Sequence, residues 1–205
     1  MKNNDKDVAV IVVNYNGLED SINCIESLYS IRDSEKITIV LVDNASRRNE
    51  ADIIAEKFPA AIVIKNNSNG GFSAGNNIGI EYALSNQYKY IMLLNNDTVV
   101  EEGIITKLMS HCTDVSVAVP KILYYSSCKT IWYGGGTINK ITGNAEHENM
   151  GRSDNENDTK VRKCTFATGC CMMIQSDVLK KVGKLDENFF MYCEDTEFCI
   201  RLSLN

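Results

Sequence analysis

Three consecutive residues with side-chain oxygens, Asn95, Asn96 and Asp97, directly follow an apolar run at residues 90–94. The run predicts a buried strand, and open α/β sheets bind ligands just beyond the carboxyl ends of their strands. Asp97 would there be a hard oxygen ligand, suited to a divalent cation that also binds phosphate oxygens. An ordinary turn is the alternative, because Asn, Asp and Thr are common turn residues.

Two earlier apolar runs end in polar residues in the same way. Residues 8–13 lead into Asn14 and Tyr15, and residues 37–42 lead into Asp43. Continuous apolar runs of this length are typical of parallel strands buried on both faces. If the strands are parallel, their polar ends meet at one edge of the sheet, so the sequence predicts a single crevice there.

Residues 66–79 contain four glycines and five asparagines and precede a predicted helix that runs towards Leu84. The glycine spacing matches neither the G-x-G-x-x-G dinucleotide fingerprint nor the P-loop. Glycines at a helix start allow a ligand to approach the backbone closely. Tight packing of the helix on the sheet through small residues is the alternative.

Near the end of the chain, aromatic residues lead into Glu194 and Asp195, which open another predicted helix. Because these two acids are adjacent, their side chains must point in different directions. Glu197 and Arg201 are four residues apart and predict a helix-surface ion pair of roughly 0.2 to 0.5 kcal/mol.

The elements that would position these groups alternate along the chain. Strands are predicted at residues 8–13, 37–42, 61–64, 90–94, 115–119 and 165–174, and helices at 18–28, 51–58, 104–112 and 176–182. Strands alternating with helices imply an α/β fold with an open, mostly parallel sheet and right-handed crossovers. We expect a single domain over residues 1–205, with a mobile loop at the polar residues 143–163, where His147 would be solvated and not catalytic.

The composition excludes several classes of protein. The net charge of −6 argues against nucleic acid as the main partner. An acidic protein that binds an anionic diphosphate needs local positive charge, which a metal ion can supply. With no signal-peptide pattern and no bilayer-spanning apolar run, we expect the reducing cytosol, and membrane contact would be peripheral, at the inner face. The eight cysteines include no C-x-x-C pair and predict buried or surface thiols, not a metal site.

Taken together and in order, the motifs resemble glycosyltransferase family 2, the inverting enzymes of the GT-A fold, a Rossmann-like fold of nucleotide-diphospho-sugar transferases. The resemblance is greatest to the bacterial rhamnosyltransferase-like branch, and it covers the chain from the first strand to the end. The matching segments are 12–16 (VVNYN), 42–46 (VDNAS), 69–79 (NGGFSAGNNIG), 94–98 (LNNDT), 168–174 (TGCCMMI) and 189–199 (FFMYCEDTEFC).

The resemblance implies a nucleotide-diphosphate-sugar donor bound across the strand ends. The residues that it places at the nucleotide are Asn14, Tyr15, Asp43, Asn69, Gly75 and Asn76. The D-x-D motif of the family falls on residues 95–97, so Asp97 and Asn95 would hold Mn²⁺ or Mg²⁺. An amide replaces the first acid of the motif, which leaves one carboxylate for the cation.

Asp195 matches the catalytic base of the family, and Glu194 would be a supporting acid. A positioned general base contributes roughly 100- to 10,000-fold in rate, and a metal would stabilise the departing diphosphate. A single displacement inverts the anomeric carbon. A helix-start carboxylate favoured only by the helix dipole is the alternative for Asp195.

The expected function is therefore a hexosyltransferase that makes a cell-envelope polysaccharide or a similar glycan. The acceptor would be a hydroxyl of a glycan or a lipid-linked glycan, and the resemblance leans towards dTDP-rhamnose as the donor. A nucleotide-cofactor oxidoreductase is one alternative, although the glycine spacing argues against it. A binding module without turnover is another, because the chain stops about two helical turns after Asp195, and we expect a catalytic domain truncated at its C-terminal end.

Overall fold

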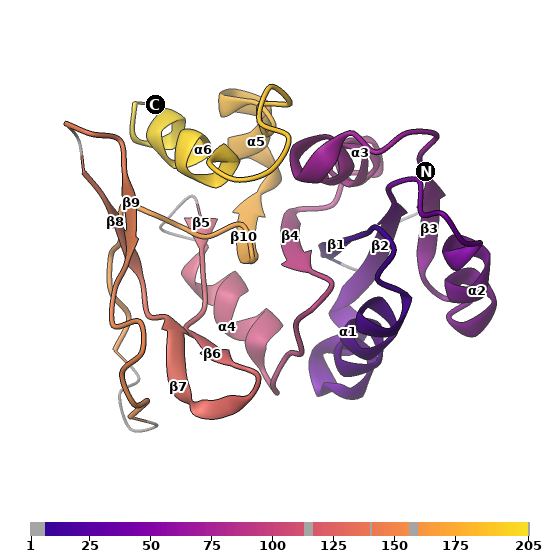
Figure 1. Ribbon diagram of the computed structural model, residues 1–205, viewed down its shortest axis with the longest axis horizontal. Coiled ribbons are helices and arrows are strands. Elements are labelled where there is room, and N and C mark those ends of the chain that lie inside the picture. Colours follow the sequence, from indigo (N-terminus) through magenta and orange to yellow (C-terminus); the bar gives the residue numbers. More distant parts are fainter. Residues whose placement is uncertain (1–6, 113–116, 140, 156–159, 205) are drawn as a thin grey trace.

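A computed structural model describes residues 7–112, 117–139, 141–155 and 160–204. Its centre is a six-stranded sheet with the strand order β3-β2-β1-β4-β10-β5 (Figure 1). The strands are β1 (Val8–Asn14), β2 (Ile37–Asp43), β3 (Ile62–Lys65), β4 (Tyr90–Asn95), β5 (Val117–Ala118) and β10 (Cys171–Gln175). The α/β fold class predicted from the sequence is confirmed.

Strands β1 to β4 run parallel to one another, as their alternation with helices predicts. The register aligns their polar ends. Asn14 of β1 lies opposite Asp43 of β2, and Val13 lies opposite Asn95 of β4. The three polar strand ends therefore meet at one edge of the sheet.

Helices cover both faces of the sheet (Figure 1). One face packs against α1 (Leu18–Ser30), α2 (Glu50–Lys57) and α4 (Ile104–His111), and a 3-10 turn, η1 (Arg32–Lys36), follows α1. The other face packs against α3 (Gly71–Ser85), α5 (Ser176–Val182) and α6 (Glu194–Ser203). In β1, Val10 and Val12 face α1 while Ala9 and Ile11 face α3, which is why the strand is apolar at every position.

The last strand is shorter than the sequence predicts and runs antiparallel to β4. Residues 165–170 form no continuous ladder with a neighbouring strand, and part of their backbone bonds to side chains instead. Tyr133 Oη donates to the Phe166 carbonyl at 2.6 Å, and the Ala167 amide donates to Cys199 Sγ at 3.2 Å. Of the strand predicted at 115–119, residues 115 and 116 lie outside the described residues.

A mobile loop is predicted at the polar residues 143–163, but part of this stretch forms a strand, β9 (Ala145–His147). This strand pairs with β8 (Gly136–Ile138), beside a second hairpin of β6 (Ile122–Tyr124) and β7 (Ser127–Tyr133). The prediction that His147 is solvated is wrong, because its ring centroid lies 4.8 Å from that of Trp132 and 5.7 Å from that of Phe166. Residues 156–159 of the stretch lie outside the described residues.

The ion pair predicted between Glu197 and Arg201 is confirmed, with nitrogen–oxygen distances of 2.5 and 2.7 Å. The same guanidinium donates to the carbonyls of Val182 and Lys184 at 2.8 and 2.7 Å. Arg201 thus binds α6 to the end of α5, a role beyond that of a surface pair. No helix in the described ranges has the length and apolar character needed to cross a membrane.

Candidate active site

A cavity of about 250 Å³ lies at the carboxyl ends of the parallel strands. Five parts of the chain form it: the end of β1, the residue after β2, the start of α3 with the loop before it, the end of β4 with the turn after it, and the segment before α6. The lining residues are Val13, Tyr15, Asn44, Asn69, Gly71, Phe72, Asn76, Leu94, Asn95, Asn96, Asp97, Phe190 and Met191. The cavity thus brings together five residues that the sequence predicts for the site, namely Tyr15, Asn69, Asn76, Asn95 and Asp97.

Asn14 and Asp43 lie beneath the cavity and are buried, with exposed fractions of 0% and 6%. The Asn14 amide donates to Asp43 Oδ1 at 2.8 Å and to Glu50 Oε2 at 2.9 Å. Ser46 Oγ also donates to Asp43 Oδ1, at 2.6 Å. These contacts fix the Asp43 carboxylate at the strand end and give Asn14 a positioning role.

Asn44 is a cavity residue that the sequence analysis did not assign to the site. Its amide nitrogen donates to Asn69 Oδ1 and to the Gly71 carbonyl, each at 2.9 Å, and its oxygen accepts from Asn66 Nδ2 at 3.0 Å. Asn44 therefore fastens the asparagine-rich loop to the end of β2. Its place directly after Asp43, at the carboxyl end of a strand, is the signal that could have identified it.

The glycines of this loop have two different roles. Gly71 has φ +81, and a Cβ there would lie 2.1 Å from the Phe190 carbonyl oxygen, so only glycine fits at this approach. A Cβ on Gly75 would lie 2.8 Å from Val13 Cγ1, and one on Gly79 would lie 2.5 Å from Ile11 Cγ2. Gly75 is absent from the cavity lining, and its contact matches the alternative of tight helix-on-sheet packing.

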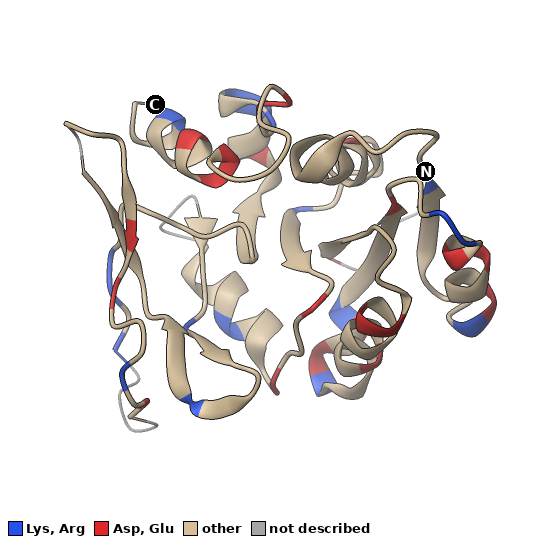
Figure 2. Ribbon diagram, in the orientation of Figure 1, with Lys and Arg blue, Asp and Glu red and all other residues tan. Residues whose placement is uncertain are grey.

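Asn95 and Asp97 offer oxygen atoms to a cation. Asn95 Oδ1 is buried and has no hydrogen-bond partner in the described part of the chain, and Asp97 lines the cavity. No lysine or arginine is among the described lining residues. Figure 2 shows lysine and arginine residues elsewhere, for example on α2, α4 and α5. The described residues hold no cluster of three or more His, Cys, Asp or Glu side chains fit for a metal. One carboxylate and one orphaned amide oxygen fit a hard cation that takes its other ligands from phosphate and water.

The thiols near this turn do not add ligands. Burial, and secondarily the nearby Asp97 carboxylate, raises the pKa of Cys24 and of Cys170 to about 12. Both groups therefore stay protonated at neutral pH, and a protonated thiol is a poor metal ligand.

Glu194 and Asp195 open α6 and point to different surroundings. Asp195 is half-buried and accepts hydrogen bonds from the amides of Gly169, at 3.1 Å, and Thr196, at 2.7 Å. Glu194 is 6% exposed, and its Oε2 is buried without a hydrogen-bond partner in the described chain. Burial, and secondarily the Asp195 carboxylate, raises the pKa of Glu194.

The segment from Leu185 to Cys193 connects α6 to α3 through hydrogen bonds. Asn77 of α3 donates to the Leu185 carbonyl at 2.9 Å and accepts from the Leu185 amide at 3.1 Å. Near the C-terminal end of the segment, the Phe190 carbonyl accepts a hydrogen bond from the Phe72 amide at 2.7 Å. Tyr192 and Cys193 both have positive φ, a strained conformation that needs support from its surroundings. We call residues 185–193 the α3–α6 strap.

Asp195 does not line the cavity, but one residue, Gly169, lies between it and the lining residue Phe72. A Cβ on Gly169 would lie 3.3 Å from the Phe72 ring and 3.6 Å from Asp195 Cβ. Gly169 thus lies between the cavity wall and the carboxylate. The structure thus brings the metal-ligand candidates and the base candidate to the same end of the sheet, since the adjacent residues Gly169 and Cys170 bond to Asp195 and to the Asn95 amide.

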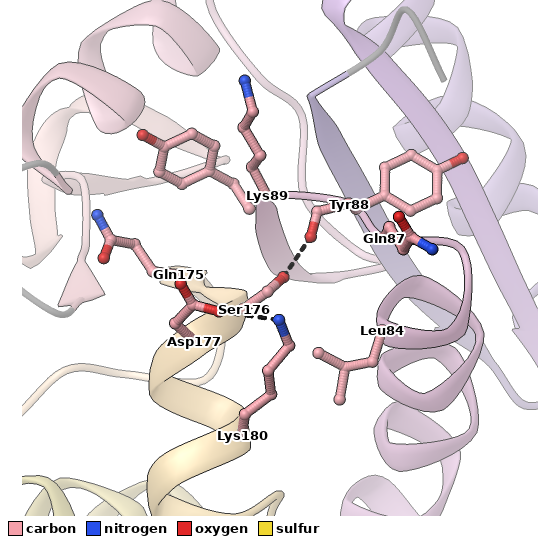
Figure 3. A pocket seen from close by; sticks show the side chains of 9 residues that line it. Leu84, Gln87, Tyr88, Lys89, Gln175, Ser176, Asp177 and Lys180 are labelled. Carbon is pink, nitrogen blue, oxygen red and sulfur yellow. Dashed lines mark hydrogen bonds and ion pairs between the residues drawn. The ribbon is translucent and has the colours of Figure 1, made fainter. Parts of the chain in front are cut away.

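A second cavity, of about 460 Å³, lies at the opposite end of β4 (Figure 3). Ser176 Oγ donates to the Tyr88 carbonyl there at 2.5 Å, and Lys180 pairs with Asp177 at 2.8 Å. None of the residues that the sequence predicts for the site lines this cavity.

Solved structures share this architecture. A mannosyltransferase from Pyrobaculum calidifontis, solved in complex with GDP-Man and Mn²⁺, aligns with a TM-score of 0.66 at 13% identity, over 98% of this chain and 52% of that one. S. aureus TarS in complex with UDP aligns with a TM-score of 0.68 at 15% identity, over 97% of this chain and 55% of that one. The fold is the GT-A fold that the sequence predicts.

Curated relatives show sequence similarity as well. A low-salt glycan biosynthesis hexosyltransferase, Agl10, of Haloferax volcanii is 30% identical over 95% of this chain and 61% of its own length. A dTDP-rhamnosyl transferase, RfbF, of Shigella flexneri is 23% identical over 96% of this chain and 63% of its own. The chain thus spans about three fifths of the length of these relatives. The family model for "Glycosyl transferase family 2" matches residues 9–183, and the chain belongs to this family.

Proposed function

We propose that this chain is the catalytic domain of an inverting glycosyltransferase that moves a sugar from a nucleotide-diphosphate donor to a hydroxyl of a glycan or lipid-linked acceptor. The observation that carries the proposal is the cavity at the strand ends, which Asp97 and the orphaned Asn95 oxygen reach from the turn after β4, with Asp195 behind Gly169, which adjoins the lining residue Phe72. A diphosphate leaving group and an attacking hydroxyl need such groups on opposite sides of the reacting carbon.

The relatives support a sugar nucleotide as the donor. RfbF is named a dTDP-rhamnosyl transferase and Agl10 a hexosyltransferase, and the mannosyltransferase structure holds GDP-Man with Mn²⁺. We propose dTDP-rhamnose as the first donor to test, because the RfbF similarity extends over nearly the whole chain. A lipid-linked acceptor would bring the enzyme to the inner face of the cell membrane.

Asp97 and Asn95 would hold Mn²⁺ or Mg²⁺, which supplies positive charge to the diphosphate as it departs. Tyr15 and the loop from Asn69 to Asn76 border the same cavity and would contact the nucleoside. Asp43 would act at the nucleoside end as well, held in place by Asn14 and Ser46.

Asp195 would act as the general base. The two amide hydrogen bonds from Gly169 and Thr196 hold its carboxylate in one orientation. The carboxylate takes the proton of the acceptor hydroxyl while that oxygen bonds to the anomeric carbon. The bond from this carbon to the diphosphate oxygen breaks in the same step, so the configuration inverts.

The first test is calorimetric titration of the protein with UDP and dTDP, each with and without Mn²⁺. We expect one nucleotide to bind more tightly with Mn²⁺, and Asp97→Ala to abolish that enhancement because it removes the only carboxylate of the turn. The base of the tighter nucleotide identifies the donor class. Failure of both nucleotides to bind at millimolar concentration would contradict the proposal.

The second test removes the base. Asp195→Asn should lower sugar transfer or donor hydrolysis by roughly 100- to 10,000-fold while nucleotide affinity is unchanged, because Asp195 lies outside the cavity lining. Asp177→Asn, an exposed acid in the first turn of α5, is the matched control and should keep the wild-type rate. Transfer at the wild-type rate by Asp195→Asn would refute the base assignment. Nucleotide binding without turnover by the wild type would instead favour a binding module.

A further inference from the structure

A continuous hydrogen-bond chain runs beneath the cavity from the turn after β4 to the end of β2. Asn96 Nδ2 donates to Ser21 Oγ at 2.9 Å, and Ser21 Oγ donates to Asn14 Oδ1 at 2.7 Å. Asn14 Nδ2 then donates to Asp43 Oδ1 at 2.8 Å. Ser21 and Asn14 are both fully buried. The chain therefore joins the metal end of the cavity to its nucleoside end through groups that water does not reach.

The direction of every hydrogen bond in this chain is determined from one end. The carboxylates of Asp43 and Glu50 can only accept, so Asn14 must turn its NH₂ group towards them. Asn14 Oδ1 then faces Ser21 and takes the single hydroxyl hydrogen. The Ser21 oxygen is left as an acceptor, and Asn96 must present its NH₂ group to it. Hydrogen bonds aligned in one direction strengthen one another.

This orientation decides what Asn96 offers a ligand. Its nitrogen is used by Ser21 Oγ and by the Gly17 carbonyl, the latter at 3.5 Å. Within the described chain no donor bonds to its oxygen, and the residue lines the cavity together with Asn95 and Asp97. The Asn96 side-chain oxygen therefore remains available to a ligand. An oxygen acceptor can bind a cation or a sugar hydroxyl, but it repels a phosphate group.

We propose that Ser21 is a positioning residue for both ends of the donor site: it sets the Asn96 amide at the metal end and the Asn14–Asp43 pair at the nucleoside end. The inference rests on the proposed function, since it takes the cavity to be the donor site. Removal of the hydroxyl would leave Asn14 Oδ1 without its donor and let the Asn96 amide rotate.

A purely structural role for Ser21 can be separated from this one by a matched serine. Ser176 is also buried, lies at the start of a helix and donates to a backbone carbonyl, that of Tyr88 (Figure 3). It lies at the opposite end of the sheet from the donor cavity. Ser176→Ala therefore carries a similar folding cost without touching the chain of hydrogen bonds.

The experiment measures the two ends of the site separately in the wild type, Ser21→Ala and Ser176→Ala, all as the whole chain. Binding of the nucleoside monophosphate in EDTA reports the nucleoside end. The factor by which Mn²⁺ tightens binding of the nucleoside diphosphate reports the metal end. Ser21→Ala should weaken the first and reduce the second, each by at least about threefold, and Ser176→Ala should change neither.

A loss at one end only, or at neither, would overturn the inference while the proposed function stands. If Ser21→Ala does not fold, Ser21→Cys replaces it, since a thiol keeps the volume but is a weaker donor, and it should give smaller losses at both ends. A wild type that binds no nucleotide would overturn the proposed function itself, and this inference with it.

Discussion

At the scale of single residues, the two adjacent acids of α6 differ in what surrounds them. Asp195 receives two backbone amides, whereas Glu194 is buried with one oxygen unpartnered in the described chain. Burial therefore raises the pKa of Glu194. The burial of Glu194 thus disfavours a second negative charge next to Asp195, and this is the supporting role that we propose for it.

This difference predicts a pH dependence of stability. Because the folded pKa of Glu194 is raised, the folded state binds its proton more tightly than the unfolded state does. The free energy of unfolding should thus fall as pH rises from the ordinary glutamate range, about 4.3, through the raised pKa. Glu194→Gln removes this loss, so the variant should gain thermal stability relative to the wild type towards neutral pH.

Melting temperatures measured from pH 4 to 8 would check this prediction. Glu101→Gln, at an exposed position after β4, is the control and should follow the wild-type curve. Wild-type and Glu194→Gln curves that stay parallel across the whole range would contradict the raised pKa.

At the scale of elements, α3 holds the site together. Its first turn contacts the α3–α6 strap through Phe72, its middle packs on β1 through Gly75 and Gly79, and Asn77 binds Leu185 at the start of the strap. The loop before α3, proposed to contact the donor, and the strap that leads to α6 are therefore both fixed to α3. Displacement of one end of α3 would shift both.

Removal of the Asn77 contacts should separate binding from catalysis. Asn77→Ala deletes the hydrogen bonds to both backbone groups of Leu185 and one to Glu187 Oε1 at 2.8 Å. Because the strap precedes the base, sugar transfer should fall roughly 10- to 100-fold, while Mn²⁺-dependent nucleotide affinity is kept. Asn86→Ala, at the exposed end of α3, is the control. An equal loss of affinity and of rate would contradict this role for the strap.

Much of this arrangement could be predicted from the sequence, since the pattern that reveals it is local. Apolar runs followed by polar residues predicted β1, β2 and β4, and the parallel order then predicted the crevice with Asp97 at its edge. What could not be predicted depends on contacts between distant segments. The antiparallel direction of β10, the stacking of His147 on Phe166 and the hydrogen bonds from Asn77 to Leu185 all join parts of the chain that no local pattern relates.

The same limit applies within the site, where the structure adds contacts that no motif reveals. Asn14 and Gly75 follow the family motif as well as Tyr15 does, yet one is buried under Asp43 and the other packs on Val13. Asn44 could not be distinguished from its neighbours, because its contacts with Asn66, Asn69 and Gly71 appear only once the loop has folded back on β2.

At the scale of the whole molecule, the two cavities lie at opposite ends of β4, and only the one at the carboxyl end collects the family motifs. The sheet divides the chain accordingly. Strands β1 to β3 with their helices carry the residues that we propose at the nucleoside, and β4, β10 and β5 form the half with the proposed metal turn and the segments that lead to Asp195 (Figure 1).

The strand order also has a consequence for how the chain folds during synthesis. Within the described residues, β5 joins the sheet only through β10, and β10 leaves the ribosome after β5 and all of β6 to β9. Until then β4 is an open edge that can pair with another chain. Closure of the sheet is thus a late, non-local event, and such events are slow and expose nascent chains to aggregation. Strand β10, which joins β5 to β4, is thus also the strand that covers the open edge of β4.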